Sequence, residues 1–144
     1  ARRWLRGGLR LLKRETERQI LADGVHAELS VFYQRMILEA LLEFIALAER
    51  NHFRLPEVIP DRARRMHSFL VGICRPDGQF PLLGDGFRSD VLLRFDVLAA
   101  GAALLNGMDE TDATGYAPSP DHCHMNHRTL CLLNGRMPRC SLTA

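Results

Sequence analysis

The residues best suited to proton transfer stand around one Gly-containing turn and the segment after it. Tyr33 follows Ser30 by three residues, and His26 and Glu28 lie between Asp23-Gly24 and Ser30. A tyrosine, with an ordinary pKa of about 10, can donate a proton when neutral or accept one when a nearby cation depresses its pKa. The commoner role of such a residue is an aromatic on a helix's apolar face with its hydroxyl at the rim. His26 and Glu28 could line a cleft, or either could equally be a solvated loop residue.

A second group of reactive residue types lies near the C-terminus and comprises His122, Cys123, His124, His127 and Cys131. These residues are zinc-ligand types, but their spacing matches no common C-x2–4-C or H-x3–5-H arrangement ending in a second Cys pair. An imidazole with an ordinary pKa near 6.5 can instead exchange protons at working pH, or it can belong to a solvated His-rich tail. The four cysteines contain no CxxC pair, which is a poor basis for a disulfide framework.

Four segments have the apolar spacing of amphipathic helices and would position these residues. The predicted helices run from Trp4 to Leu21, from the N-cap Ser30 to about Arg50, from Asp61 to Ile73, and from Ser89 or Asp90 to about Asn106-Gly107. Residues 75–86, rich in Gly and Pro, read as an ordered loop or short hairpin. The last three helices are expected to pack as antiparallel neighbours around a core of Phe44, Ile45, Phe69, Leu70, Phe95 and Leu98.

The composition changes after Gly107, where Asp, Thr, Gly and Pro precede the His/Cys group and a short β-like run over 129–136. A domain boundary is therefore expected within residues 107–118. The fold class predicted from the pattern is mainly α, with antiparallel helix pairs. Periodicity alone does not separate a helical bundle from a section of an α/α solenoid or toroid.

Three segments, in chain order, contain distinctive motifs. Residues 17–33 contain an RQI-type run, then DG, a Glu, a Ser and the Tyr that opens the next helix. Residues 76–85 read PDGQFPLLGD, and residues 122–136 begin with His-Cys-His and contain an Asn-Gly-Arg run. Together these segments resemble the heparinase II/III family of polysaccharide lyases. The family's loop has PDG, an apolar residue, Pro, two apolar residues, Asn and Asp, and here Gly84 stands in place of Asn, a change expected to loosen the loop. The last segment looks like the HxHAD…L…NGR opening of the family's β domain, with Met125 and Asn126 replacing Ala and Asp.

The resemblance implies a fold and a reaction. Residues 1–106 would form part of an α/α toroid, and residues 107–144 a linker and the truncated start of an antiparallel β domain. The family cleaves acidic, uronate-containing polysaccharides by β-elimination and needs no cofactor. Tyr33 corresponds to its catalytic tyrosine and His124, or His122, to its β-domain histidine, while His26 and Glu28 would bind substrate. The Asn-His pair that neutralises the substrate carboxylate would lie upstream, so the isolated chain is expected to be nearly inactive.

Charge and hydropathy exclude other partners. A net charge of +2 from 19 basic and 17 acidic residues is too even to indicate nucleic acid, and the basic residues of the first predicted helix read as a solvated face. The longest apolar stretches, such as residues 97–105, are shorter than the roughly 20 residues that span a bilayer. The sequence starts without Met or signal peptide, so any targeting segment is expected outside it, and a periplasmic and a cytoplasmic location in a bacterium are not distinguished.

Two other classes of function compete with the lyase. One is a helical protein-interaction module without catalysis, and the other a zinc-binding module built on the C-terminal His and Cys residues. A scaffold has no need for two Gly/Asp/Pro loops of this form, which favours the lyase. The sequence does not identify the polysaccharide.

Overall fold

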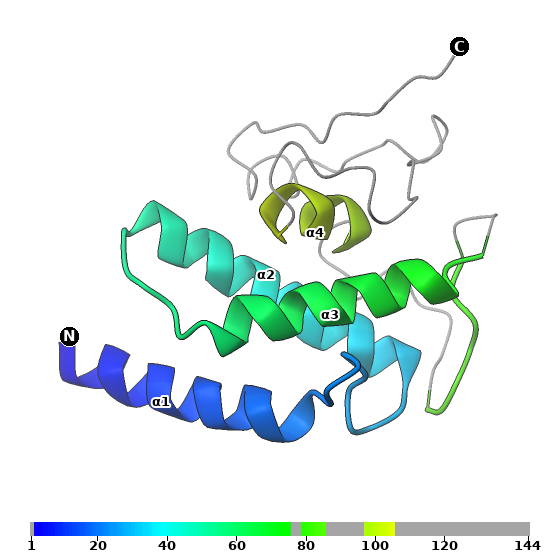
Figure 1. The fold of residues 1–144 in the computed structure, drawn as a ribbon, viewed down its shortest axis with the longest axis horizontal. Coiled ribbons are helices and arrows are strands. Elements are labelled where there is room, and N and C mark those ends of the chain that lie inside the picture. The colour runs from blue at the N-terminus through cyan, green and yellow to red at the C-terminus, as the bar shows by residue number, and fades with distance from the viewer. Residues whose placement is uncertain (1, 76–78, 86–96, 106–144) are drawn as a thin grey trace, which may run out of the picture.

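The computed structural model describes residues 2–75, 79–85 and 97–105. This part of the chain contains the helices α1 (Arg2–Gln19), α2 (Val31–Arg50), α3 (Val58–Ile73) and α4 (Val97–Leu105), and it contains no strand (Figure 1). The prediction of a mainly helical fold is thus confirmed. The toroid remains a prediction, and the expected β domain, with its start at 129–136, lies outside the described residues.

The predicted boundaries of the first three helices can be compared with the structure. Ser30 is the N-cap of α2 in an extended conformation, as predicted, although its hydroxyl forms no capping hydrogen bond. The first helix ends at Gln19 rather than Leu21. The third begins at Val58, before the expected Asp61, because Pro60 lies in its first turn. The N–H groups in the first turn of a helix have no partner within the helix, so a proline at this position costs no helical hydrogen bond.

Helix α3 lies at the centre of the packing and contacts each of the other three helices. In Figure 1, α2 runs in the direction opposite to α3, so this pair is antiparallel as expected. Helix α1 packs on α3 rather than on α2 and runs in the same direction as α3. Of the predicted core residues, Ile45, Leu70 and Leu98 are buried, each side chain contributing about 1.5–3 kcal/mol by its removal from water. Phe44 and Phe69 are only half-buried, and Phe95 lies outside the described residues. None of the helices in the described part is long and apolar enough to cross a membrane.

A histidine and a glycine join α3 to α4. His67 is 1% exposed, and its Nε2 lies 2.9 Å from the carbonyl oxygen of Leu98. A Cβ at Gly101 would overlap the His67 ring, so α4 can approach α3 this closely only because position 101 has no side chain. Arg64 of α3 donates from Nε to the Leu105 carbonyl at 3.1 Å, which satisfies an end carbonyl of α4.

We expect Gly101→Ala to destabilise the chain by about 1–3 kcal/mol, because the added methyl group must displace the enclosed His67 ring. The matched control is Gly8→Ala in α1, where a Cβ would meet nothing within 4 Å. There, the higher helix propensity of alanine should stabilise by about 0.5–1 kcal/mol. Urea unfolding curves for both variants measure these changes. Equal effects of the two substitutions would contradict the proposed packing of His67 on Gly101.

Candidate functional site

The segment between α1 and α2 begins with a tight turn. The N–H of Gly24 donates to the Leu21 carbonyl at 3.0 Å, and the N–H of Leu21 donates to the Val25 carbonyl at 2.9 Å. The Asp23 carboxylate accepts from the Val25 N–H at 3.0 Å, the side-chain-to-backbone bond that makes Asp favourable in turns. Gly24 has a φ of +90°, and a Cβ there would overlap the α3 backbone at Arg65. The Asp-Gly pair seen in the sequence is thus required by the geometry of the turn.

Gln34 in α2 fixes this turn from inside the protein. Its side chain is 1% exposed. Its Oε1 accepts from the backbone N–H of His26 at 2.7 Å, and its Nε2 donates to the carbonyl of Gly24 at 2.7 Å and more weakly to that of Met66 at 3.4 Å. Sequence reasoning missed Gln34. The available signal was a polar residue on the face of α2 that also carries Leu38 and Leu41.

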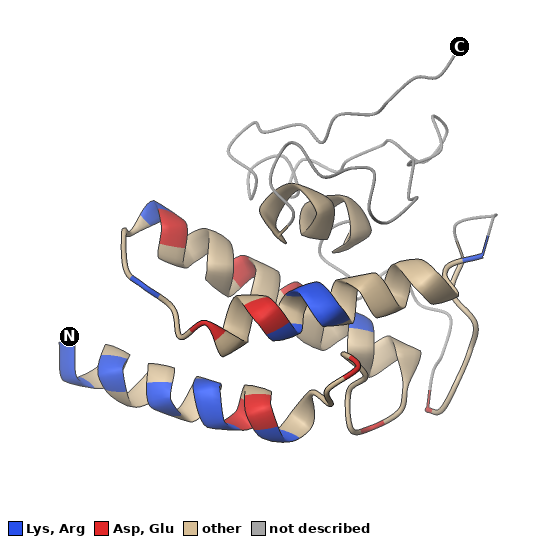
Figure 2. Ribbon diagram, in the orientation of Figure 1, with Lys and Arg blue, Asp and Glu red and all other residues tan. Residues whose placement is uncertain are grey.

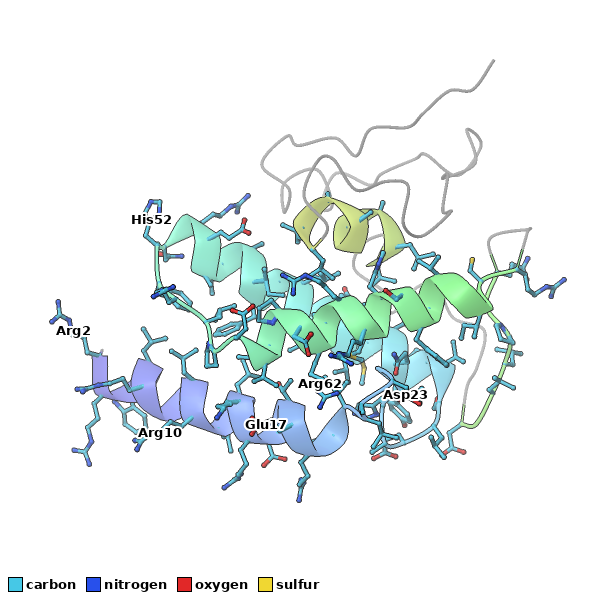
Figure 3. All side chains as sticks on the ribbon, viewed as in Figure 1. Arg2, Arg10, Glu17, Asp23, His52 and Arg62 are labelled. Atoms are coloured by element: carbon cyan, nitrogen blue, oxygen red, sulfur yellow. The ribbon has the colours of Figure 1, made fainter. Side chains whose placement is uncertain are left out.

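Two arginines of α3 hold the same turn from the other side. Arg62 donates from Nη1 to the Leu21 carbonyl at 2.9 Å, and Arg65 donates from Nη1 to the Ala22 carbonyl at 2.9 Å. Asp61 orients Arg65 through an ion pair at 3.1 Å. Figure 3 shows Arg62 pointing from α3 toward the end of α1, near the turn that carries Asp23.

The second Gly/Pro loop meets the start of α2. The N–H of Val31, the first residue of the helix, donates to the Leu83 carbonyl at 3.3 Å. Gly84 has a φ of +68°, and a Cβ there would lie 2.7 Å from the Leu29 carbonyl oxygen. Gly84 therefore permits a close approach of this loop to the residue before Ser30, rather than only loosening it. Arg35 covers the loop's Phe80 ring, with its guanidinium carbon 4.7 Å from the ring centroid.

Tyr33 lies in the first turn of α2, at the point where these two loops meet. Its ring is half-buried and stands edge-on to Phe32, with the centroids 5.6 Å apart and an interplanar angle of 68°. Among the described residues, none forms a hydrogen bond with the Tyr33 hydroxyl. Packing therefore holds the ring, and no group in the described part of the chain competes with a ligand for the hydroxyl.

His26 is enclosed rather than presented on an open surface. It is 4% exposed, and its Nδ1 accepts from the backbone N–H of Glu28 at 3.3 Å. Burial lowers the pKa of His26, and the nearby Glu28 carboxylate partly opposes that effect. The ring is therefore neutral at pH 7 and carries its proton on Nε2, which has no partner among the described residues. Glu28 itself is exposed.

The residues between His26 and α2 carry further signs of local strain. Leu29 has a φ of +53°, a left-handed conformation that costs a non-glycine residue roughly 1–2 kcal/mol. The Ser30 hydroxyl is buried and forms no hydrogen bond within the described part of the chain. Positive-φ residues and unpaired buried polar atoms collect at ligand sites more often than elsewhere.

The substrate-binding role of His26 and Glu28 and the catalytic role of Tyr33 remain predictions. His124, the second predicted catalytic residue, lies outside the described residues, as does the rest of the C-terminal His/Cys group. In residues 2–75, 79–85 and 97–105, no three His, Cys, Asp or Glu side chains gather in a way that could hold a metal ion.

Two curated proteins show what the chain is similar to. A heparin-sulfate lyase of Pedobacter heparinus is 28% identical over 104 residues, which is 71% of this chain and 16% of that protein. A heparin-sulfate lyase of Bacteroides thetaiotaomicron is 33% identical over 79 residues, which is 54% of this chain and 11% of that protein. The chain thus spans less than a fifth of the length of either relative. No solved structure matches it.

The heparinase II/III N-terminus family matches residues 1–102. The match includes α1, α2 and α3, both loops around the start of α2, and most of α4. It therefore takes in every described residue of the candidate site. The chain belongs to the heparinase II/III family.

Proposed function

We propose that this chain is a segment of a polysaccharide lyase that cleaves a uronate-containing polysaccharide by β-elimination, with Tyr33 as a proton-transfer residue. The observation that carries the proposal is the meeting of two distant loops at the start of α2. The first loop is tied there by Gln34, and the second by the bond between Val31 and Leu83. Tyr33 stands between them, and its hydroxyl has no hydrogen-bond partner among the described residues. Both relatives carry the name heparin-sulfate lyase, which supports the reaction class.

The reaction needs one base and one acid. The base removes the proton at C5 of the uronate, the electron pair forms the C4–C5 double bond, and the C4–O bond breaks. The acid then protonates the departing glycosidic oxygen. A tyrosine hydroxyl can perform either proton transfer, depending on its protonation state. The N-terminal end of α2 favours an anionic group nearby, and a substrate carboxylate at this place would benefit from it.

His26 and Glu28 would assist by binding substrate. Neutral His26 offers a proton on Nε2, and Ser30 offers a hydroxyl proton, and neither group has a partner among the described residues. Both atoms are enclosed, so the segment between the turn and α2 must open before a substrate oxygen can accept from either group. Such a bond would then remove the cost of an unpaired buried donor, about 1–3 kcal/mol. The exposed Glu28 would contact sugar hydroxyls rather than a uronate carboxylate, since like charges repel.

The isolated chain should have little activity of its own. Neutralising the substrate carboxylate requires preorganised donors, and removal of one such donor typically lowers the rate by about 100- to 1000-fold. In the family pattern, the Asn-His pair that supplies these donors would lie upstream of the segment that carries Tyr33. The assays of catalysis below therefore use the longer protein that carries this segment.

Tyr33→Phe tests the assignment of the proton-transfer residue. The substitution keeps the ring that packs against Phe32 and removes the hydroxyl, so stability should change by less than about 0.5 kcal/mol while turnover falls by about 100-fold or more. Ultraviolet absorbance of the new C4–C5 double bond measures turnover on heparan, alginate and glucuronan. Met36→Leu, on the exposed side of α2, is the control and should keep parental activity. Parental turnover by the Phe variant would remove Tyr33 from the mechanism.

His26 should make the stability of this chain depend on pH. Its pKa is lowered in the folded state, so its contribution is complete above the unfolded pKa of about 6.5 and is lost as the pH falls below that value. We expect His26→Asn, which retains an acceptor for the Glu28 N–H, to lose less stability than the parent between pH 7 and pH 5. Urea midpoints at the two pH values measure the difference. The control is His52→Asn, since His52 is exposed. If His26→Asn and His52→Asn both follow the parent, His26 is not the titrating group.

A further inference from the structure

Helix α1 carries an unusual excess of positive charge. Seven of its 18 residues are Arg or Lys and two are Glu. Its first acidic residue is Glu15, so the helix from Arg2 to Arg14 contains basic, apolar and glycine residues only. Figure 2 shows this positive charge following α1 from its N-terminal end, whereas Lys, Arg, Asp and Glu are mixed on α2 and α3.

The two halves of α1 differ in how their charges are paired. In the C-terminal half, Lys13 pairs with Glu17 at 3.5 Å, and Arg14 and Arg18 pair with Glu15 at 2.9 and 3.1 Å. The cations of the N-terminal half are exposed, and within the described part of the chain they have no ion-pair or hydrogen-bond partner. This N-terminal basic face consists of Arg2, Arg3, Arg6 and Arg10.

The basic face has the shape of a stripe. At 3.6 residues per turn, its four arginines fall within an arc of about 100° around the helix axis. Along the axis, the positions Arg3, Arg6 and Arg10 recur about every 5 Å, because each residue advances the helix by 1.5 Å. Figure 3 shows Arg10 on the side of α1 that faces away from α2 and α3, and Arg2 extending beyond the N-terminal end of the helix. A linear polyanion with regularly repeated charges could therefore follow the stripe.

The rest of α1 argues against a lipid surface as the partner. A helix that lies in a membrane inserts one apolar face. Here the apolar residue Leu12 packs against the core and Thr16 is buried, so this side of α1 is already occupied by α3. The exposed apolar side chains Trp4 and Leu11 lie on a third side of the helix. An even overall charge of +2 likewise does not favour nucleic acid.

We propose that the N-terminal basic face of α1 binds a sulfated, uronate-containing polysaccharide, as a holding site separate from the loops around Tyr33. The guanidinium group forms paired hydrogen bonds with sulfate-like and carboxylate groups, which suits arginine to such a ligand. The basic face and the turn at Asp23 lie at opposite ends of α1, so one long chain could engage both. The choice of polyanion rests on the proposed function.

The test uses the complete 144-residue chain and a defined heparin oligosaccharide. Trp4 is the only tryptophan of the chain, is 85% exposed and adjoins Arg3, so its fluorescence reports on binding at this face. The variant Arg3→Gln/Arg6→Gln/Arg10→Gln keeps the helix propensity of α1, which circular dichroism checks. We expect it to bind about tenfold more weakly at moderate salt, with a smaller decline in affinity as salt rises.

The matched control also removes three positive charges, but at positions outside the basic face. Lys13→Gln/Arg18→Gln/Arg54→Gln changes two cations that already face glutamates and one exposed cation beyond α2. It should retain most of the parental affinity. If both triple variants weaken binding equally, affinity follows net charge and the site is wrong. The proposal is also wrong if heparin leaves Trp4 fluorescence unchanged, or if phosphatidylserine vesicles bind the chain more tightly than heparin.

Binding and catalysis fail separately in these experiments. Tyr33→Phe should bind the heparin oligosaccharide as the parent does, because Tyr33 lies beyond the opposite end of α1. In the longer lyase, the three arginine substitutions should raise KM for long chains and leave kcat unchanged. If Tyr33→Phe keeps full turnover while the arginine variant loses heparin binding, the catalytic assignment fails and the holding site stands.

Discussion

The candidate site depends on the hydrogen bonds that the buried side-chain amide of Gln34 forms with the turn between α1 and α2. Its oxygen accepts from the His26 N–H and its nitrogen donates to the Gly24 carbonyl, so one side chain of α2 fixes both ends of the turn. Leaving such buried groups unpaired would cost about 1–3 kcal/mol each, which disfavours other positions of the turn. The turn also needs glycine at position 24, because a Cβ there would overlap the α3 backbone that the turn contacts. Tyr33 immediately precedes Gln34 in α2, so the hydrogen bonds of Gln34 also fix the position of Tyr33 relative to the turn.

Rigid contacts around the turn contrast with unsatisfied groups at its far end. Arg62 and Arg65 bind the turn carbonyls through charge-assisted hydrogen bonds, which are stronger than neutral ones. Toward α2, by contrast, Leu29 is left-handed and the Ser30 hydroxyl is unpaired within the described part of the chain. A sequence usually departs from locally favourable choices at functional positions. Two such departures, at Leu29 and Ser30, lie between the fixed turn and Tyr33, which is where a sugar would have to bind for Tyr33 to act on it.

Local patterns predicted the helices well because apolar spacing and caps are properties of neighbouring residues. Ser30 as N-cap and the apolar spacing of α2 and α3 are examples. Predictions that depended on tertiary contacts were less accurate. The third helix was expected to begin at Asp61, but Pro60 belongs to the first turn of α3. Phe44 and Phe69 were placed in the core but are half-buried. Gln34 was not found, since its importance comes from Met66 and Gly24, which lie on other segments. The turn at Asp23-Gly24 was found, but its contact with Arg65 could not be inferred from spacing.

Helix α1 lies between the two proposed sites, and three sides of the helix have different surroundings. One side, with Leu12 and Thr16, packs on α3, and its C-terminal end leads directly into the turn that Gln34 holds. A second side presents arginines that have no ion-pair partner among the described residues, and a third presents Trp4. Because α1 is anchored through α3, the arginines and the turn keep a fixed separation along one rigid element. A polyanion held on the arginines would lose translational freedom before it reached Tyr33, which raises its effective concentration at the turn without any new contact there. Such an arrangement favours long chains over short ones, since only a chain that spans α1 can occupy both ends.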